Sequence, residues 1–209
     1  MARGRLILVS APSGAGKTSL VNALLENAAE SGSKLCVSVS HTTRPKRPVE
    51  VDGNNYHFVS EAHFKSLQDT DTFLEYAEVF GNFYGTSRHW VEEQLESGWD
   101  VILEIDWQGA EQVKSLVEGA ISIFILPPSL KALRERLTNR GQDDEAVINK
   151  RMAEAVSEIS HHDLADYFII NEHFDQALQE LETIIQCSRL GIPYDQPDCS
   201  ELLENLVNG

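Results

Sequence analysis

The sequence of 209 residues has few cysteines, few basic side chains and no long hydrophobic run. None of its apolar stretches approaches the ~20 residues that a membrane-spanning helix needs, so we expect no transmembrane segment. The first apolar run has only four residues after Arg3 and Arg5, which is too short for a signal peptide and favours a cytoplasmic protein. Cys36, Cys187 and Cys199 are widely separated and form no CxxC pair, which argues against a disulfide framework and a zinc site.

The shortage of basic residues leaves 17 lysines and arginines against 33 acidic side chains, a formal net charge of −16. Such a charge argues against broad nucleic-acid binding and against attachment to an anionic membrane surface. An anionic ligand must therefore bind where the few basic residues cluster, and they cluster at 44–47 and at 134–151. The length suits one core domain with smaller inserts, and the sequence leaves open whether the chain forms a homo-oligomer.

Residues 10–19 join a short apolar run at 6–9 to a helical pattern that begins at Leu20. This order of strand, glycine-rich turn and helix is typical of a loop that binds phosphate groups. Gly14 and Gly16 allow the backbone to turn tightly with its N–H groups pointing inward, and the helix N-terminus adds a partial positive charge. We therefore expect an ATP-type phosphate site in this loop.

Two polar residues after the glycines support this interpretation. Lys17 supplies a cation for the β- and γ-phosphates, and Thr18 is placed to bind Mg²⁺. The pattern G-x-x-x-x-G-K-[ST] is met except at its first position, where Ala11 replaces glycine. An ordinary glycine-rich turn is the alternative, but it explains neither Lys17 and Thr18 nor the flanking strand and helix. The residues of this loop that we expect to bind ATP are Ala11, Pro12, Ser13, Gly14, Ala15, Gly16, Lys17, Thr18 and Ser19.

Strand and helix patterns alternate along most of the chain. Apolar runs typical of strands occur at 6–9, 34–40, 101–106, 120–126 and 167–170. Helical patterns begin near residues 20, 61, 87, 129, 144 and 174. This alternation predicts an α/β fold in which helices flank a parallel sheet.

Residues 40–86 depart from the alternation and suggest a small β-rich insert, with a hairpin at Gly81 and Asn82. Near the end of the chain, Leu202, Leu203 and Leu206 predict a short amphipathic turn that either docks or frays. The expected division is core at 1–39, insert at 40–86, core at 87–128, a helical region at 129–160, core at 161–190 and a tail at 191–209.

Arg44 and Arg47 are three residues apart in a loop that Pro45 and Pro48 restrict, so their guanidinium groups can converge on one phosphate. A basic tetrapeptide in a loop is usually solvated surface, and that alternative would be preferred for these residues alone. In a chain of net charge −16 that also has a phosphate loop, a phosphate ligand is favoured. Asp106 ends an apolar run, and such a residue either lies beside the metal of a phosphate site or caps the next turn, two alternatives that remain open.

An ordered set of motifs along the chain resembles the bacterial guanylate kinases. The motifs are 40–48 (SHTTRPKRP), Gly53, Tyr56, 73–75 (FLE), 81–86 (GNFYGT), 105–109 (IDWQG), 140–141 (RG) and 150–152 (KRM). The resemblance extends from about residue 5 to residue 190. It implies a P-loop NTPase core, a GMP-binding insert at 40–86, a helical lid within 129–160, and Mg²⁺-dependent phosphoryl transfer from ATP.

The resemblance also implies roles for individual residues. Arg44, Arg47 and Tyr56 would hold the GMP phosphate, and Asn171 matches a position near the adenine. The residues assigned in this way to GMP are Ser40, Arg44, Arg47, Tyr56, Glu75, Tyr84, Thr86, Glu104 and Asp106. Those assigned to catalysis are Lys17, Arg44, Arg136, Arg140 and Arg151.

Two carboxylates bear on the choice of base. Glu75 lies in the apolar run 73–76, where a buried charge without partners would be costly, and guanine offers two donors that one carboxylate can accept together. A solvent-facing strand residue is the alternative for Glu75. Glu104 stands where the family usually has an aspartate facing the guanine, and its extra methylene leaves open whether it contacts the base directly.

The reaction requires no general base, because a phosphate monoester has a second pKa of about 6 and is largely ionised near neutral pH. Catalysis is expected from alignment and from charge neutralisation by Lys17, Mg²⁺ and the lid arginines. The histidines, including His41, His161 and His162, lack metal-ligand spacing, and loop or helix-end positions are the preferred alternative for them.

Three classes of protein fit parts of the pattern: an enzyme that phosphorylates GMP, a noncatalytic guanylate-kinase-like module of a scaffold, and a related small-molecule kinase such as a ribose-bisphosphate kinase. Binding modules usually lack a working phosphate loop, which residues 16–18 retain. A sugar-phosphate kinase would not need Glu75, Tyr84 and Thr86. We therefore predict transfer of the γ-phosphate of ATP to GMP or dGMP, with ATP and GMP as the partners.

Overall fold

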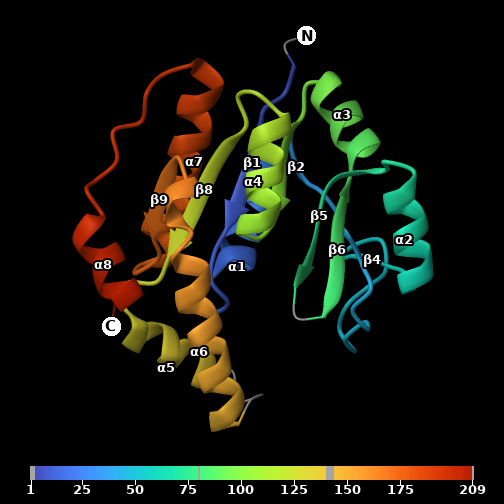
Figure 1. Ribbon diagram of the computed structural model, residues 1–209. Coiled ribbons are helices and arrows are strands. Elements are labelled where there is room, and N and C mark those ends of the chain that lie inside the picture. Colours follow the sequence, from blue (N-terminus) through green and yellow to red (C-terminus); the bar gives the residue numbers. More distant parts are fainter. Residues whose placement is uncertain (1–2, 80, 140–143, 209) are drawn as a thin grey trace.

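The computed structural model describes residues 3–79, 81–139 and 144–208. Its main sheet has the strand order β2-β7-β1-β8-β9, and every pair in it is parallel. These strands are β1 (Leu6–Ser10), β2 (Leu35–Val37), β7 (Asp100–Glu104), β8 (Ile121–Leu126) and β9 (Tyr167–Ile170). The parallel sheet expected from the alternating patterns is therefore confirmed, and β1 lies at its centre (Figure 1).

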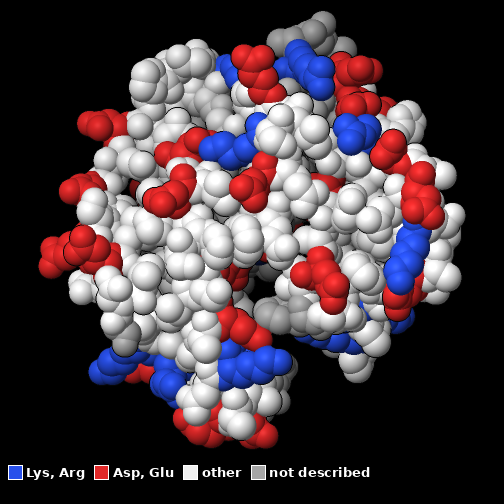
Figure 2. Space-filling view, viewed as in Figure 1, with Lys and Arg blue, Asp and Glu red and all other residues white. Residues whose placement is uncertain are grey.

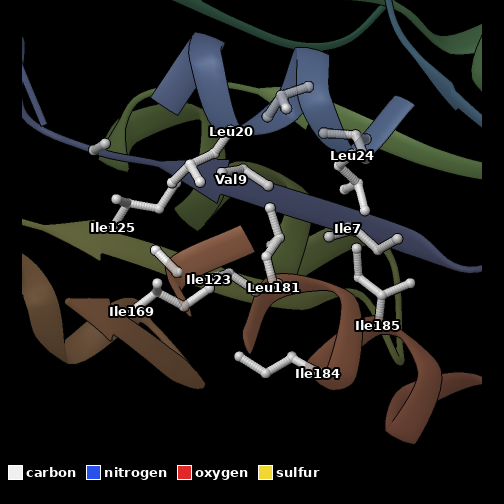
Figure 3. Close-up of a cluster of buried hydrophobic side chains, with 14 of the residues drawn as sticks. Ile7, Val9, Leu20, Leu24, Ile123, Ile125, Ile169, Leu181, Ile184 and Ile185 are labelled. Atoms are coloured by element: carbon white, nitrogen blue, oxygen red, sulfur yellow. The ribbon is translucent and has the colours of Figure 1, made fainter. Parts of the chain in front are cut away.

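Helices cover both faces of this sheet because alternate residues of each strand point to opposite faces. Ile7 and Val9 of β1 pack with α1 (Lys17–Ser31) and α7 (Phe174–Leu190), as Figure 3 shows. Leu6 and Leu8 point the other way and pack with α3 (Arg88–Glu96) and α4 (Trp107–Leu116). All five residues of β1 are buried, so the loop that follows β1 is held by a strand with helices on both sides.

The insert is a second sheet with the strand order β4-β3-β6-β5. Its elements are β3 (His41–Thr42), β4 (His57–Phe58), α2 (Glu61–Asp69), β5 (Phe73–Val79) and β6 (Asn82–Ser87). β5 and β6 pair in antiparallel fashion, which confirms the predicted hairpin. The strand expected at 34–40 is present but shorter, at 35–37, because the chain leaves the main sheet after β2 and enters the insert sheet at β3.

The remaining elements are helical, and the two that follow β8 extend from the carboxyl edge of the main sheet (Figure 1). They are α5 (Leu130–Asn139), α6 (Glu145–Ile159), a short 3-10 helix at His162–Leu164, and α8 (Ser200–Asn208). Leu203 and Leu206 of α8 pack with Ile159 of α6, so in the structure the tail docks and does not fray. Among the described residues, no helix has both the length and the apolar character to cross a membrane.

Candidate functional site

The phosphate loop, residues 11–19, connects the carboxyl end of β1 to the first turn of α1. Gly14 and Gly16 have φ angles of 97° and 98°, a left-handed backbone that side chains disfavour. The N–H of Ala15 donates to the oxygen of Pro12 at 3.0 Å, which closes a tight turn before the helix begins. The loop therefore has the strand, turn and helix arrangement that its sequence predicts.

Asn171, which follows β9, supports this loop through a hydrogen bond from its side chain. Its Nδ2 donates to the main-chain oxygen of Ala15 at 2.7 Å, in a buried contact. A Cβ on Gly16 would lie 2.4 Å from this Nδ2, so only glycine allows the approach. Arg136 donates to the oxygen of Asn171 at 2.6 Å. One residue thus links the loop, the end of β9 and an arginine of α5.

Helices α5 and α6 also contact the loop directly. Nη2 of Arg151 in α6 donates to Oγ of Ser13 at 2.6 Å. A Cβ on Gly14 would lie 3.0 Å from the methyl groups of Leu133 and Leu137, both of which are fully buried in α5. Arg136 and Arg151 therefore lie near the phosphate loop, whereas Arg140 falls outside the described residues.

Lys17 and Thr18 begin α1, with Thr18 and Ser19 exposed on its first turn. A carboxylate that the sequence analysis did not single out faces this region. Burial raises the pKa of Glu158 in α6 to about 7, the Lys17 ammonium opposes this rise, and Asp106 adds to it. The rings of Trp107 and His161 stack at 3.7 Å between centroids, which joins the start of α4 to the end of α6.

Asp106 caps α4, since its Oδ1 accepts from the N–H of Gly109 at 3.0 Å. This is the capping alternative left open by the sequence. The same residue also raises the pKa of both Glu75 and Glu158, so it lies between the insert and α6.

The basic loop of the insert contains an ion pair that the sequence analysis missed. Arg44 makes two hydrogen bonds to the Glu50 carboxylate, at 2.6 and 3.1 Å, and the main-chain N–H of Arg47 donates to the same carboxylate at 2.8 Å. The guanidinium of Arg44 also lies 5.4 Å from the ring centroid of Tyr56. A hydrogen bond to Glu50 is the largest influence that raises the pKa of Arg44, and Tyr84 acts in the same direction. Arg44, Tyr56 and Tyr84 therefore converge.

Glu75 lies in the buried part of the insert, with only 4% of its surface exposed, so the solvent-facing alternative is wrong. Oγ1 of Thr86 donates to its Oε1 at 2.5 Å, and the hydroxyl of Ser40 lies 3.3 Å from that of Thr86. Burial raises the pKa of Glu75 to about 7, against the lowering effect of the Thr86 hydrogen bond, and nearby Asp106 raises it further. A carboxylate in this state gains from a ligand that offers N–H donors.

Glu104 is the last residue of β7 and lies close enough to Tyr56 of the insert to influence it. Its Oε1 is buried without a hydrogen-bond partner among the described residues. Its charge contributes to raising the pKa of Tyr56, after burial and Tyr84. Glu104 therefore lies near Tyr56 and the residues that converge with it, and its Oε1 is an acceptor available to a ligand.

The surface is hollowed between α6 and the insert, and basic side chains gather over α5 and α6 below the hollow (Figure 2). Acidic side chains are spread over much of the remaining face in this view. Basic side chains thus gather beside the phosphate loop and in the loop of the insert, while others lie elsewhere on this face (Figure 2). Sequence reasoning found these cations, but it missed Glu50, Glu158 and the helix α4, because an isolated glutamate or a ten-residue segment with a glycine carries little pattern.

The chain is similar to known proteins over nearly its whole length. A family model described as guanylate kinase matches residues 3–188. A guanylate kinase of Saccharophagus degradans is 58% identical over 205 residues, which are 98% of this chain and 98% of that protein. A guanylate kinase of Vibrio vulnificus strain YJ016 is 58% identical over 207 residues, 99% of each chain. The solved structure of guanylate kinase from Anaplasma phagocytophilum has a TM-score of 0.73 and 34% identity, and the match covers 98% of this chain and 95% of that one.

Proposed function

The chain belongs to the guanylate kinase family, and we propose that its phosphate loop holds ATP while its insert holds GMP. The protein transfers the γ-phosphate of ATP to GMP. The contacts described above and the chemistry of the two nucleotides support a role for individual residues in each part of that reaction.

On the donor side, the main-chain N–H groups of the phosphate loop and the ammonium of Lys17 bind the β- and γ-phosphates. Asn171 holds the loop in shape through Ala15, and we assign it to the adenine side from the sequence resemblance. The exposed Thr18 hydroxyl is a hard oxygen ligand on the first turn of α1, which suits Mg²⁺. When bound, Mg²⁺ neutralises phosphate charge.

On the acceptor side, Arg44, Arg47, Tyr56 and Tyr84 surround the GMP phosphate. The ion pair with Glu50 and the hydrogen bond to the Pro45 main-chain oxygen fix the orientation of the Arg44 guanidinium, and we assign donors that they do not use to the phosphate. A phosphate oxygen of GMP is already ionised and serves as the nucleophile, so no protein base has to remove a proton.

Transfer then depends on alignment and on charge neutralisation. Arg136 and Arg151 contact the elements that surround the phosphate loop, which supports assigning them to stabilise the charge on the moving phosphoryl group. We assign Arg140 to the same group from the sequence motif. Arginines in this role contribute about 10³-fold or more to turnover.

The single observation that carries guanine as the base is the buried Glu75 carboxylate, bonded to Thr86 at 2.5 Å. Oε2 of Glu75 accepts none of the hydrogen bonds described above, and burial disfavours the ionised carboxylate. A partner with two N–H donors would stabilise that ionised form, and guanine has such donors on N1 and on the 2-amino group. Neither a sugar-phosphate acceptor nor a protein-binding module requires such a group. We place Ser40, Glu104 and Asp106 beside it as further contacts to the GMP nucleoside.

Lys17→Met tests the donor assignment. The substitution keeps the length of the side chain but removes its charge, so we expect turnover to fall by about 10²-fold or more, while GMP binding without ATP is unchanged. Lys65→Met, at an exposed lysine of α2 paired with Glu61, is the matched control and should retain activity. A folded Lys17→Met variant with near-normal kcat would overturn the assignment.

A comparison of acceptors tests the choice of substrate. ADP formation is measured with GMP, dGMP, AMP, UMP and ribose 1,5-bisphosphate at equal concentrations. We expect the guanine nucleotides to be used far faster than the others. Equal use of AMP and GMP would rule out recognition of the base by Glu75.

A further inference from the structure

Strand β5 contacts the core at its first residues. Leu74 is 5% exposed and belongs to the hydrophobic cluster that Leu103, Ile105 and Val113 form on one face of the main sheet. The next residue is Glu75, and α4 lies beside this part of β5 (Figure 1). The carboxylate assigned to guanine is therefore located where the insert meets the core.

Gln112 of α4 makes a double contact across this border. Its Nε2 donates to the main-chain oxygen of Tyr76 at 2.8 Å, and its Oε1 accepts from the main-chain N–H of Tyr76 at 3.2 Å. A side-chain amide that pairs with both polar groups of one residue imitates a neighbouring strand and fixes the position of the backbone. The residue that it fixes is adjacent to Glu75.

Gly109, one turn earlier in α4, lies directly against the Glu75 carboxylate. A Cβ on Gly109 would lie 2.8 Å from Oε2 of Glu75 and 3.3 Å from its Cδ. Oε1 is meanwhile held by Thr86. Oε1 is thus held by a hydrogen bond from the insert, and Oε2 occupies space that a side chain at position 109 of α4 would fill.

We propose that Gln112 and Gly109 are positioning residues for guanine selection, which hold Glu75 at the angle that accepts both N–H donors of the base. The inference rests on the proposed role of Glu75 in binding guanine. It adds that the core helix α4, and not the insert alone, sets the specificity of the GMP site.

The consequence is measurable because hypoxanthine lacks the 2-amino group of guanine. IMP offers Glu75 only the N1–H donor, so a tilted carboxylate loses its second contact to GMP but has none to lose with IMP. Misplacement of Glu75 should therefore reduce the ratio of kcat/KM for GMP to that for IMP. A general weakening of the fold would reduce both values together and leave the ratio unchanged.

Gln112→Ala is the primary test, with Glu111→Ala on the exposed face of α4 as the matched control. We expect the GMP-to-IMP ratio to fall about fivefold in Gln112→Ala, as loss of one hydrogen bond implies, with KM for ATP unchanged. Gln112→Glu keeps the acceptor for the Tyr76 N–H but loses the donor, so its GMP-to-IMP ratio should lie between the ratios of the native protein and of Gln112→Ala. In Gly109→Ala the ratio should fall about tenfold or more, because the new methyl group displaces Oε2.

Glu75→Gln separates this inference from the function on which it rests. If Glu75→Gln lowers the ratio while Gln112→Ala and Gly109→Ala match the control, the positioning role is wrong and the role of Glu75 stands. If Glu75→Gln also leaves the ratio unchanged, guanine recognition by Glu75 fails. If Gly109→Ala does not fold, the GMP-to-IMP ratio of Gln112→Ala still decides whether α4 positions Glu75.

Discussion

The protonation of Glu75 predicts how GMP binding depends on pH. Burial, with Asp106 nearby, raises the pKa of this carboxyl to about 7 in the protein without nucleotide. A protonated carboxyl group keeps an O–H and cannot accept both donors of guanine, so binding requires the ionised form. Lowering the pH through 7 should therefore weaken GMP binding, and the bound base should in turn lower the pKa of Glu75.

The size of the effect follows from the fraction that is ionised. A group with a pKa of about 7 is about nine-tenths ionised at pH 8 and about one-tenth ionised at pH 6. The apparent Kd varies inversely with the competent fraction, so it should rise about tenfold between these two values. The GMP phosphate, with a pKa of about 6, is half protonated at the lower pH and adds at most about twofold.

Isothermal titration of GMP between pH 5.5 and 8.5 is the appropriate assay. ATP is left out, so that Glu158 beside Lys17 has no phosphate to respond to. Glu75→Gln is the control, because it cannot titrate and should show only the weaker dependence of the phosphate itself. If the native Kd changes with pH no more than the Kd of Glu75→Gln, the argument from the raised pKa is refuted.

Two further predictions concern stability. Burial raises the pKa of Glu75 from its ordinary 4.5 to about 7 in the folded protein, so the free energy of unfolding falls as pH rises from about 4.5 to about 7 and then levels off. Glu75→Gln should therefore raise the free energy of unfolding by roughly 3 kcal/mol at pH 8 in urea titrations and by less at pH 5. A smaller gain at pH 8 than at pH 5 would contradict this. Removal of residues 198–209 uncovers Ile159 and loses two buried leucines, Leu203 and Leu206, so Tm should fall by about 5–10 °C in calorimetry. An unchanged Tm would show that α8 does not stabilise α6.

The sequence was sufficient for the parts of the site that depend on neighbours in the chain. The phosphate loop could be predicted because the residues that determine it are neighbours in the sequence. Gly14, Gly16 and Lys17 lie within about ten residues of the strand before them and the helix after them. Arg44 and Arg47 could be found for the same reason. The parallel sheet also followed, since apolar runs and helical patterns alternate over the whole chain.

The environment of Glu75 could not be derived in this way. Its burial depends on Thr86 from the next strand and on Gly109 from α4, more than 30 positions further along the chain. A period-two pattern allows Glu75 to face either solvent or the interior, and only the packing of β5 on the core decides. Similarly, Asn171 supports Ala15 across 156 positions, a contact that no local pattern predicts.

The same contacts bear on how the proposed site of this acidic protein accepts two anionic nucleotides. Arg44 is bonded to Glu50, Arg136 to a main-chain oxygen and Arg151 to the Ser13 hydroxyl, so each of these cations has an acceptor within the chain. Such acceptors hold the guanidinium groups in place, and the Glu50 carboxylate also offsets the charge of Arg44. Since an arginine has five donors, each group can keep its acceptor and still bind a phosphate. The acidic residue among them, Glu50, therefore contributes to anion binding by orienting Arg44.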